Sequence, residues 1–373
     1  MKYLFVFIAT YFLISCQSEL PENKSIEVLA VIDSLIIPID ETIPHNPGVV
    51  DYLADENLLA ITNTQGRSIM LFDLNEKSLT QNIEFEREGP NGVSYLFAMS
   101  FASKDTIVIL DGYRGIKLSD REGNILLSSV MTSAAGNFIP VKPILAGNNL
   151  VAYSRGPIEA FNEDNFLNKA NNSLAITFHT VDSTQNQWLS YPETFGKDTW
   201  VAQHLWFYPT YNKASNQLIF ANAGSDSIWV MEGDRLQNQK QVYFGTQSFI
   251  APTKYTTGVP GQNTPVEQED MDNWFIKEAS AYSAIHFDEF SRLYYRLISL
   301  PNPAGTSIAE KPLGLLVANE DFSEIKEFRL PPAIEHELAA GSFFTTQDGL
   351  YLFNGDINES HWKWYLFRPA YLF

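Results

Sequence analysis

The sequence repeats a short pattern of four apolar β-type segments separated by turns. Residues 96–130 show it most clearly, with the runs "LFAMSFA", "DTIVILDG", "GIKLSD" and "GNILLSSVM". Runs of four to eight residues rich in Ile, Val and Leu, bounded by Gly, Asn and Asp, are typical of strands joined by tight turns. One such unit cannot bury both of its faces alone. Repetition of the unit therefore predicts a stacked or circular array.

The pattern recurs along the chain. Five units hold four strands each and the last holds three, and the units cover residues 49–87, 96–130, 138–191, 205–245, 282–330 and 338–367. The missing strand is available at the other end, in "SIEVLAVIDSLII" at residues 25–37. A circular array protects its strand edges, and a strand from the opposite end closes the ring. We therefore predict an all-β, six-bladed β-propeller with four-stranded antiparallel blades, whose last blade is closed by an N-terminal strand.

The N-terminus predicts export and an anchor. Lys2 precedes an apolar run of about a dozen residues, as in a secretory signal, and the run is too short to span a bilayer. It ends in "LISC", where Cys16 is the single cysteine of the chain. This stretch resembles the lipobox of bacterial lipoproteins, which implies cleavage between Ser15 and Cys16 and lipidation of the Cys16 thiol. The expected organisation is a signal peptide over 1–15, a tether over 16–24 and the propeller over 25–373.

The alternative for Cys16 is a buried or nucleophilic thiol. A nucleophilic cysteine needs a histidine partner and a lowered pKa, and no folded domain precedes Cys16 to supply them. The lipid interpretation also explains the lone cysteine, because an exported protein without disulfides needs no other thiol. The membrane, reached through the lipid at Cys16, is thus an expected partner.

The charge balance excludes one class of partner. The chain carries 25 basic and 44 acidic residues, for a formal net charge of −19. Nucleic acids bind basic surfaces, so no nucleic-acid partner is expected. The simplest interpretation of the acidic excess is that it keeps the protein soluble.

Residues 86–126 carry a family resemblance. The stretch "EREGPNGVSYLFAMSFASKDTIVILDGYRGIKLSDREGNIL" has a Gly89-Pro90 turn, then Asp111 at the end of a strand, then an Asp120-x-x-Gly123 turn. It resembles the inter-blade signature of six-bladed propeller lipoproteins of Bacteroidota, the DUF4221 type. The resemblance implies a place in the cell envelope, at the outer membrane. The family has no established reaction, so no catalytic residue is transferred and the catalytic residues stay unknown.

Familiar catalytic motifs are missing from the sequence. There is no G-x-S-x-G elbow, no HExxH and no P-loop. Some six-bladed propellers are calcium-dependent lactone or ester hydrolases, and by that resemblance Asp51, Asp111 and Asp288 are candidate calcium ligands. Each of them also closes a strand or turn, where Asp is common for local reasons. No other cofactor is expected.

A second set of residues predicts a pocket. Aromatic residues are frequent in the second half of the chain, where they either stack ligands or pack between blades. The candidates near expected inner strands or their loops are His204, Trp206, His286, Tyr294 and Arg296.

Three insertions interrupt the repeat, at residues 155–172, 192–204 and 246–281. Long insertions in compact domains are usually functional or disordered, and connections of this parity should share one rim of the ring. We therefore expect a binding module that recognises a protein or glycan partner on one rim. The alternatives are a calcium-dependent hydrolase that uses the central channel and a structural accessory of an envelope complex. Ligand identity and oligomeric state are not predicted.

Overall fold

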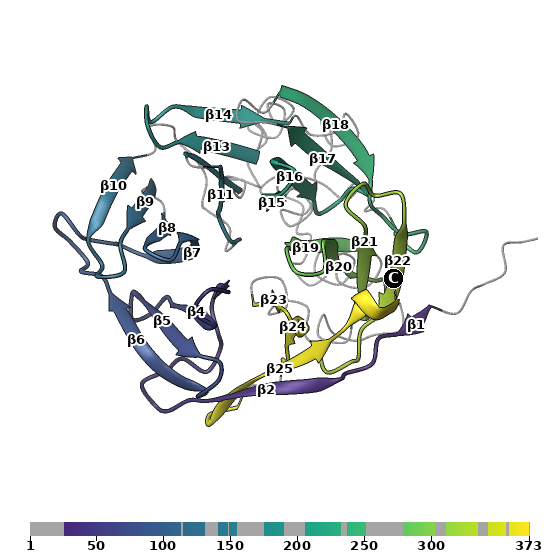
Figure 1. The fold of residues 1–373 in the computed structure, drawn as a ribbon, viewed down its shortest axis with the longest axis horizontal. Helices are drawn as coiled ribbons and strands as arrows, with labels where there is room; N and C mark the ends of the chain where they lie inside the picture. The colour runs from purple at the N-terminus through teal and green to yellow at the C-terminus, as the bar shows by residue number, and fades with distance from the viewer. Residues whose placement is uncertain are drawn as a thin grey trace, which may run out of the picture.

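The computed structural model describes a ring of six β-sheets. It describes residues 26–112, 115–130, 141–147, 149–154, 175–189, 206–232, 237–250, 279–302, 311–334, 342–355 and 358–372. Each sheet is a blade, and the blades follow one another around a central axis (Figure 1). The predicted six-bladed propeller is therefore confirmed. No helix in these ranges is long and apolar enough to cross a membrane.

The first three blades are antiparallel four-stranded sheets, and the strands of each are named in order from the axis outward. The first holds β3 (Val50–Leu53), β4 (Leu58–Asn63), β5 (Ser68–Asp73) and β6 (Ser78–Glu84). The second holds β7 (Leu96–Ser103), β8 (Thr106–Asp111), β9 (Gly115–Ser119) and β10 (Ile125–Val130). The third holds β11 (Ile144–Ala146), β12 (Leu150–Ser154), β13 (Ala175–His179) and β14 (Gln185–Trp188).

The next two blades repeat the order. The fourth holds β15 (Phe207–Asn212), β16 (Gln217–Asn222), β17 (Ser227–Glu232) and β18 (Gln237–Tyr243). The fifth holds β19 (Ala281–Asp288), β20 (Leu293–Ser299), β21 (Leu313–Ala318) and β22 (Ile325–Arg329).

The sixth blade joins both ends of the chain. It holds β23 (Phe344–Thr346), β24 (Gly349–Phe353) and β25 (His361–Phe367), and its outer strand is β2 (Asp33–Pro38). Strand β2 pairs antiparallel with β25 over its whole length, from Asp33 opposite Leu366 to Pro38 opposite His361. The predicted closure by an N-terminal strand is confirmed. The chain then ends in a short 3-10 helix, Pro369–Leu372.

The N-terminal segment differs from the prediction in one respect. The sequence predicts one strand over 25–37, whereas the structure has two. The short β1 (Glu27–Val28) pairs parallel with β22 and adds a fifth strand to the fifth blade. The chain then crosses to the sixth blade, and only β2 closes the ring (Figure 1).

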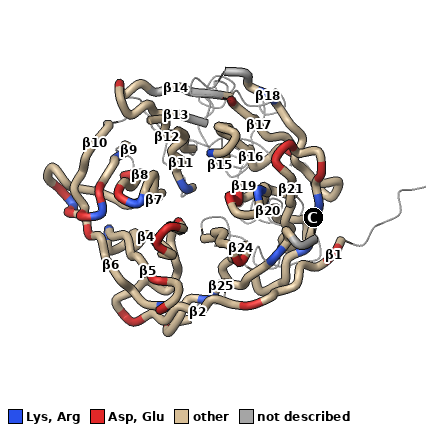
Figure 2. The backbone as a smooth tube through the Cα atoms, in the orientation of Figure 1, with Lys and Arg blue, Asp and Glu red and all other residues tan. Residues whose placement is uncertain are grey.

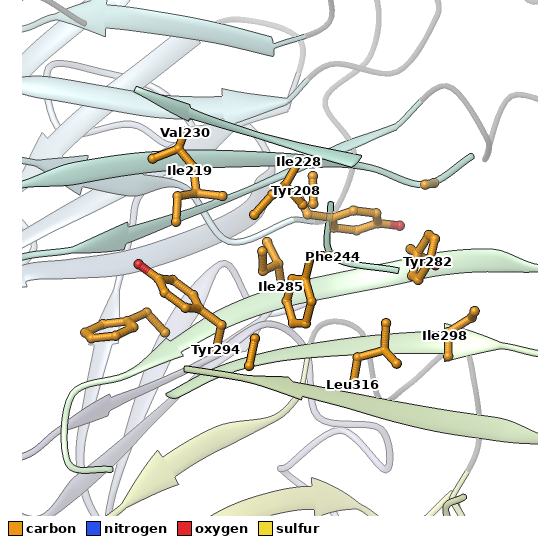
Figure 3. Close-up of a cluster of buried hydrophobic side chains, with 14 of the residues drawn as sticks. Tyr208, Ile219, Ile228, Val230, Phe244, Tyr282, Ile285, Tyr294, Ile298 and Leu316 are labelled. Carbon is orange, nitrogen blue, oxygen red and sulfur yellow. The ribbon is translucent and has the colours of Figure 1, made fainter. Parts of the chain in front are cut away.

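The hydrophobic core is a ring of clusters, one at each junction between neighbouring blades. Inner and second strands are covered on both faces, so they are apolar runs rather than alternating ones, as in β16 and β20. Figure 3 shows the junction of the fourth and fifth blades, where Ile219 and Val230 face Tyr294 and Ile285. Outer strands such as β6 are mostly exposed.

Candidate functional site

A cavity of about 220 Å³ lies on the axis, lined by residues of the inner strands and of the segments that flank them. Every blade contributes to its wall, because the six inner strands converge on the axis (Figure 1). Each blade contributes at least one polar side chain, and we call the following six, one from each blade, the channel ring: Asp51, Ser100, Lys142, Thr210, His286 and Thr345. A polar lining supplied by all six blades makes this cavity the candidate functional site.

A polar-aromatic pair on the inner strands builds most of this ring. Asp51-Tyr52, Ser100-Phe101, Thr210-Tyr211 and His286-Phe287 all line the cavity. Successive side chains on a strand point in opposite directions. The polar member therefore points toward one neighbouring blade and the aromatic member toward the other.

Hydrogen bonds of ring members join three pairs of neighbouring blades. The Phe101 amide donates to Asp51 Oδ2 at 2.6 Å, and the Phe287 amide donates to Thr210 Oγ1 at 3.0 Å. His286 Nε2 lies 2.9 Å from Thr345 Oγ1. These bonds join the first blade to the second, the fourth to the fifth, and the fifth to the sixth. Their partners are therefore held at fixed positions around the axis.

The two charges of the ring neutralise each other. Lys142 Nζ forms an ion pair with Asp51 Oδ1, which also accepts the Tyr52 amide at 3.0 Å. Acidic and basic segments of both signs reach the inner ends of the blades (Figure 2). An opposite charge and hydrogen bonds both offset the cost of partly burying a carboxylate. The ring therefore has no net charge from this pair.

Burial, assisted by the positive charge of Lys142, lowers the pKa of His286 from 6.5 to about 3. Desolvation disfavours the imidazolium form, and a nearby cation disfavours it further. His286 is therefore neutral at physiological pH. One nitrogen of the neutral imidazole carries a proton, and the other can accept a hydrogen bond. The side chain therefore bonds to Thr345 as a neutral group.

This lowered pKa predicts an acid-sensitive fold. As the pH falls below 6.5, His286 takes up a proton in the unfolded chain, whereas in the folded chain it stays neutral down to about pH 3. The free energy of unfolding therefore decreases as the pH is lowered through this window. His286→Gln removes this titration. Between pH 7.5 and pH 4.5 the free energy of unfolding of the variant should fall by up to about 2 kcal/mol less than that of the wild type. Urea unfolding at the two pH values measures the difference. Equal losses in both proteins would contradict the prediction.

Ser100 is the one ring member whose buried hydroxyl has no hydrogen-bond partner among the described residues. Its side chain is 3% exposed, and it lines the cavity. Buried polar groups are nearly always hydrogen-bonded, and an unpaired hydroxyl costs about 1–3 kcal/mol. Because the Ser100 oxygen itself is covered, a group that enters the cavity can supply the missing partner once the serine side chain rotates toward it.

Three aromatic rings lie close together in the cavity wall, on the side of the first, fifth and sixth blades. The Tyr52 ring lies 6.4 Å from that of Phe290 and 6.0 Å from that of Phe344, and Phe290 is 39% exposed. Glu289 is exposed beside Phe290 and also lines the mouth. The mouth thus offers apolar ring faces around a polar interior.

The mouth lies on the face of the turns that join inner to second strands. The three predicted insertions fall elsewhere: β12 to β13, β14 to β15, and β18 to β19. By strand alternation these flanking strands all end at the opposite face, which agrees with a shared rim. The inserted segments lie largely outside the described residues. The described cavity is therefore on the other face from the rim expected to bind.

The three aspartates proposed as calcium ligands do not come together. Only Asp51 lines the cavity. Asp111, at the end of β8, accepts the Tyr95 amide at 2.9 Å and pairs with Lys117 Nζ at 2.8 Å. Asp288 accepts the Phe290 amide at 3.0 Å in the turn after β19. Across the described part of the chain no three acidic, histidine or cysteine side chains form a metal-binding group.

Of the four predicted pocket residues that the structure describes, His286 alone lines the cavity. Tyr294 is fully buried, and its hydroxyl accepts a hydrogen bond from Asn212 Nδ2 at 3.1 Å. Trp206 packs against the core between the fourth and fifth blades. His204 lies outside the described residues, as do Ser15 and Cys16 of the predicted processing site.

Arg296 is a structural residue of the same junction. Its side chain is fully buried on β20, and its guanidinium lies over the Tyr282 ring at 3.5 Å. It donates to three backbone carbonyls of the fourth blade and the segment that follows it, those of Asn222 at 2.9 Å, Ser225 at 2.7 Å and Phe244. It therefore joins two blades and does not reach the channel.

Sequence reasoning missed four ring members, Ser100, Lys142, Thr210 and Thr345. Serine and threonine carry no signal alone. The available signal was the recurrence of a polar residue before an aromatic one on inner strands, in "DY", "SF", "TY" and "HF". Lys142 has no such signal, because it precedes β11 and belongs to no strand.

The fold and this site define the class: a six-bladed β-propeller with a polar cavity on its axis. The chain belongs to the DUF4221 family, a domain of unknown function, whose profile matches residues 25–329. No curated protein matches the sequence significantly.

Solved structures share this fold. A DUF4221 member from Bacteroides vulgatus aligns with a TM-score of 0.72 and 17% identity, over 91% of this chain and 97% of the other. A candidate exported protein from Bacteroides fragilis aligns with a TM-score of 0.54 and 9% identity, over 91% and 96%. A gluconolactonase from Xanthomonas campestris aligns with a TM-score of 0.48 and 11% identity, over 92% and 96%. At these identities the alignments with the two Bacteroides structures establish the fold alone.

Proposed function

We propose that the protein is a binding module of the cell envelope that holds a partner on the face where the axial cavity opens. The channel ring carries this proposal, because all six blades place polar side chains around a single cavity. Concave sites with a few convergent polar groups and aromatic walls are the usual form of ligand sites. The partner is a protein or a glycan. The net charge of −19 disfavours nucleic acid as the partner.

The proposed location is extracytoplasmic, at the outer membrane, through a lipid on Cys16. The apolar leader and the "LISC" stretch support this, together with the fold shared with a candidate exported protein of Bacteroides fragilis. Several acyl chains anchor a protein far more firmly than one. The tether of residues 16–24 then leaves the propeller free of the bilayer.

Binding is favoured over hydrolysis by how the ring is connected. Asp51 is engaged by Lys142 and two backbone amides, and His286 bonds to Thr345. The calcium-dependent hydrolase remains the second candidate, although Asp51, Asp111 and Asp288 lie in separate environments. A thermal melt with millimolar calcium and then with a chelator separates the two, because a bound metal stabilises the folded state. A chelator-reversible rise would favour the hydrolase.

Photo-crosslinking on cells tests the binding face. Phe290 is replaced by p-benzoylphenylalanine, which inserts into C–H bonds of proteins and sugars alike. The matched control places the same group at Tyr243, which is 52% exposed on the outer strand β18. We expect a covalent adduct at position 290 and none at 243, detected by a mass shift of the anchored full-length protein. Adducts at 243 alone, or at neither position, would contradict the proposal.

A further inference from the structure

We infer that the channel ring binds an uncharged polyhydroxy group, the terminal residue of a neutral glycan, with Ser100 Oγ bonded to one of its hydroxyls. The inference rests on the proposed binding function and names its ligand class. Three properties of the cavity carry it: its size, its charge balance and its unused hydrogen-bonding capacity.

The size of the cavity selects a single small group. At roughly 30 Å³ per water molecule, 220 Å³ corresponds to about seven waters. This is below the range of about 300–1,000 Å³ that is typical of larger ligands. The cavity therefore accepts one ring-sized group, with the rest of the partner outside the mouth.

The charge balance selects an uncharged group. Three charged side chains line the cavity: Asp51 and Lys142, which pair with each other, and Glu289 at the exposed mouth. His286 adds no charge at physiological pH, because burial lowers its pKa to about 3. A buried charge without a counter-charge is costly. An anion would also meet Glu289, and a cation would compete with Lys142 for Asp51.

The hydrogen-bonding groups match hydroxyls. Ser100 Oγ is buried and has no partner among the described residues, and a serine hydroxyl both donates and accepts. A sugar hydroxyl does the same, so the pair satisfies Ser100 in either direction. Thr345 and Thr210 line the same wall. At the mouth, the faces of Tyr52 and Phe290 suit the C–H faces of a sugar ring.

Matched pairs of sugars test this ligand class. The probes are the methyl glycosides of glucose, galactose and mannose, each beside its uronic-acid counterpart, which differs only by a carboxylate. Purified full-length protein in detergent is titrated with each probe, and ligand-observed NMR gives the dissociation constants. We expect at least one neutral glycoside to bind, and its uronic acid to bind at least tenfold more weakly.

Two serine variants locate the contact. Ser100→Ala removes the unpaired hydroxyl and breaks no described bond, so its melting temperature should be equal to or higher than that of wild type. It should bind the neutral glycoside about tenfold more weakly, the loss expected for one good hydrogen bond. Ser283→Ala is the matched control, because Ser283 is 4% exposed with an equally unpaired hydroxyl and does not line the cavity. It should bind like wild type.

Three results would overturn the inference: no neutral glycoside binds, a uronic acid binds more tightly, or Ser100→Ala binds like Ser283→Ala. The photo-crosslink at residue 290 keeps the two proposals apart. An adduct at 290 without glycoside binding leaves the binding face standing and removes the sugar. Loss of both the adduct and glycoside binding removes the proposed function as well.

Discussion

Aspartate at both Leu35 and Ile37 should open the propeller ring and abolish cooperative folding. Both side chains are buried on β2 and pack in the cluster that joins the sixth blade to the first, beside Trp362 and Trp364. Each substitution removes buried apolar surface, worth about 2–5 kcal/mol for large-to-small changes, and adds a carboxylate to a dry site. Together they exceed about 5 kcal/mol, a large part of the stability of a typical domain.

The same strand provides the control. Ser34 and Ile36 alternate with the buried pair, and Ile36 is 40% exposed. Ser34→Asp with Ile36→Asp introduces the same charges on the outward face and should cost about 1 kcal/mol or less, as surface changes do. Urea unfolding followed by tryptophan fluorescence reports both variants, because Trp362 and Trp364 lose their burial when β2 detaches. If the two double variants unfold alike, β2 does not close the ring.

Arg296→Met should destabilise the fold by about 3–5 kcal/mol, the usual cost of breaking a buried charged network. Methionine fills much of the space but leaves the carbonyls of Asn222, Ser225 and Phe244 without their donor. Each buried unsatisfied group costs about 1–3 kcal/mol. Denaturant midpoints measure the loss.

Arg292→Met is the matched substitution on the same hairpin. Arg292 pairs with Glu320, but its side chain is 58% exposed. Exposed ion pairs contribute about 0–1 kcal/mol, so this variant should remain close to wild type. A small effect of Arg296→Met, similar to that of Arg292→Met, would show that the buried guanidinium does not join the two blades.

Much of the fold could be predicted because its signals are local. Apolar runs and turn residues define the strands, and a unit with three strands beside a spare N-terminal one predicts how the ring closes. The parallel pairing of β1 with β22 could not be predicted. It depends on where the chain passes the neighbouring blade, and two residues, Glu27 and Val28, carry no pattern of their own.

The site was harder to predict, because the sequence of a buried strand does not show which way each of its side chains points. Every residue of β20 is buried, so the sequence does not say whether Tyr294 and Arg296 face the channel or the next blade. They lie on a second strand, one step away from the axis, and face the fourth blade. His286 lies on the inner strand of the same hairpin and lines the cavity. The decisive property is the position of a strand within its blade, which only comparison of the repeats reveals.

The closing strand also sets how the protein carries mechanical load. Tension applied at the N-terminus first meets β1, whose pairing to β22 is followed by a bond from the Leu29 amide to the Arg329 carbonyl at 2.8 Å. It next meets the Ile32 amide, bonded to the Leu366 carbonyl at 2.9 Å, and only then the six residues of β2. The contacts of β1 and the ring closure by β2 are thus in series. The short contacts of β1 and Leu29 with the fifth blade therefore break first and protect the pairing of β2 with β25. A pull on the N-terminal side of β1 thus detaches β1 from the fifth blade before the propeller ring can open.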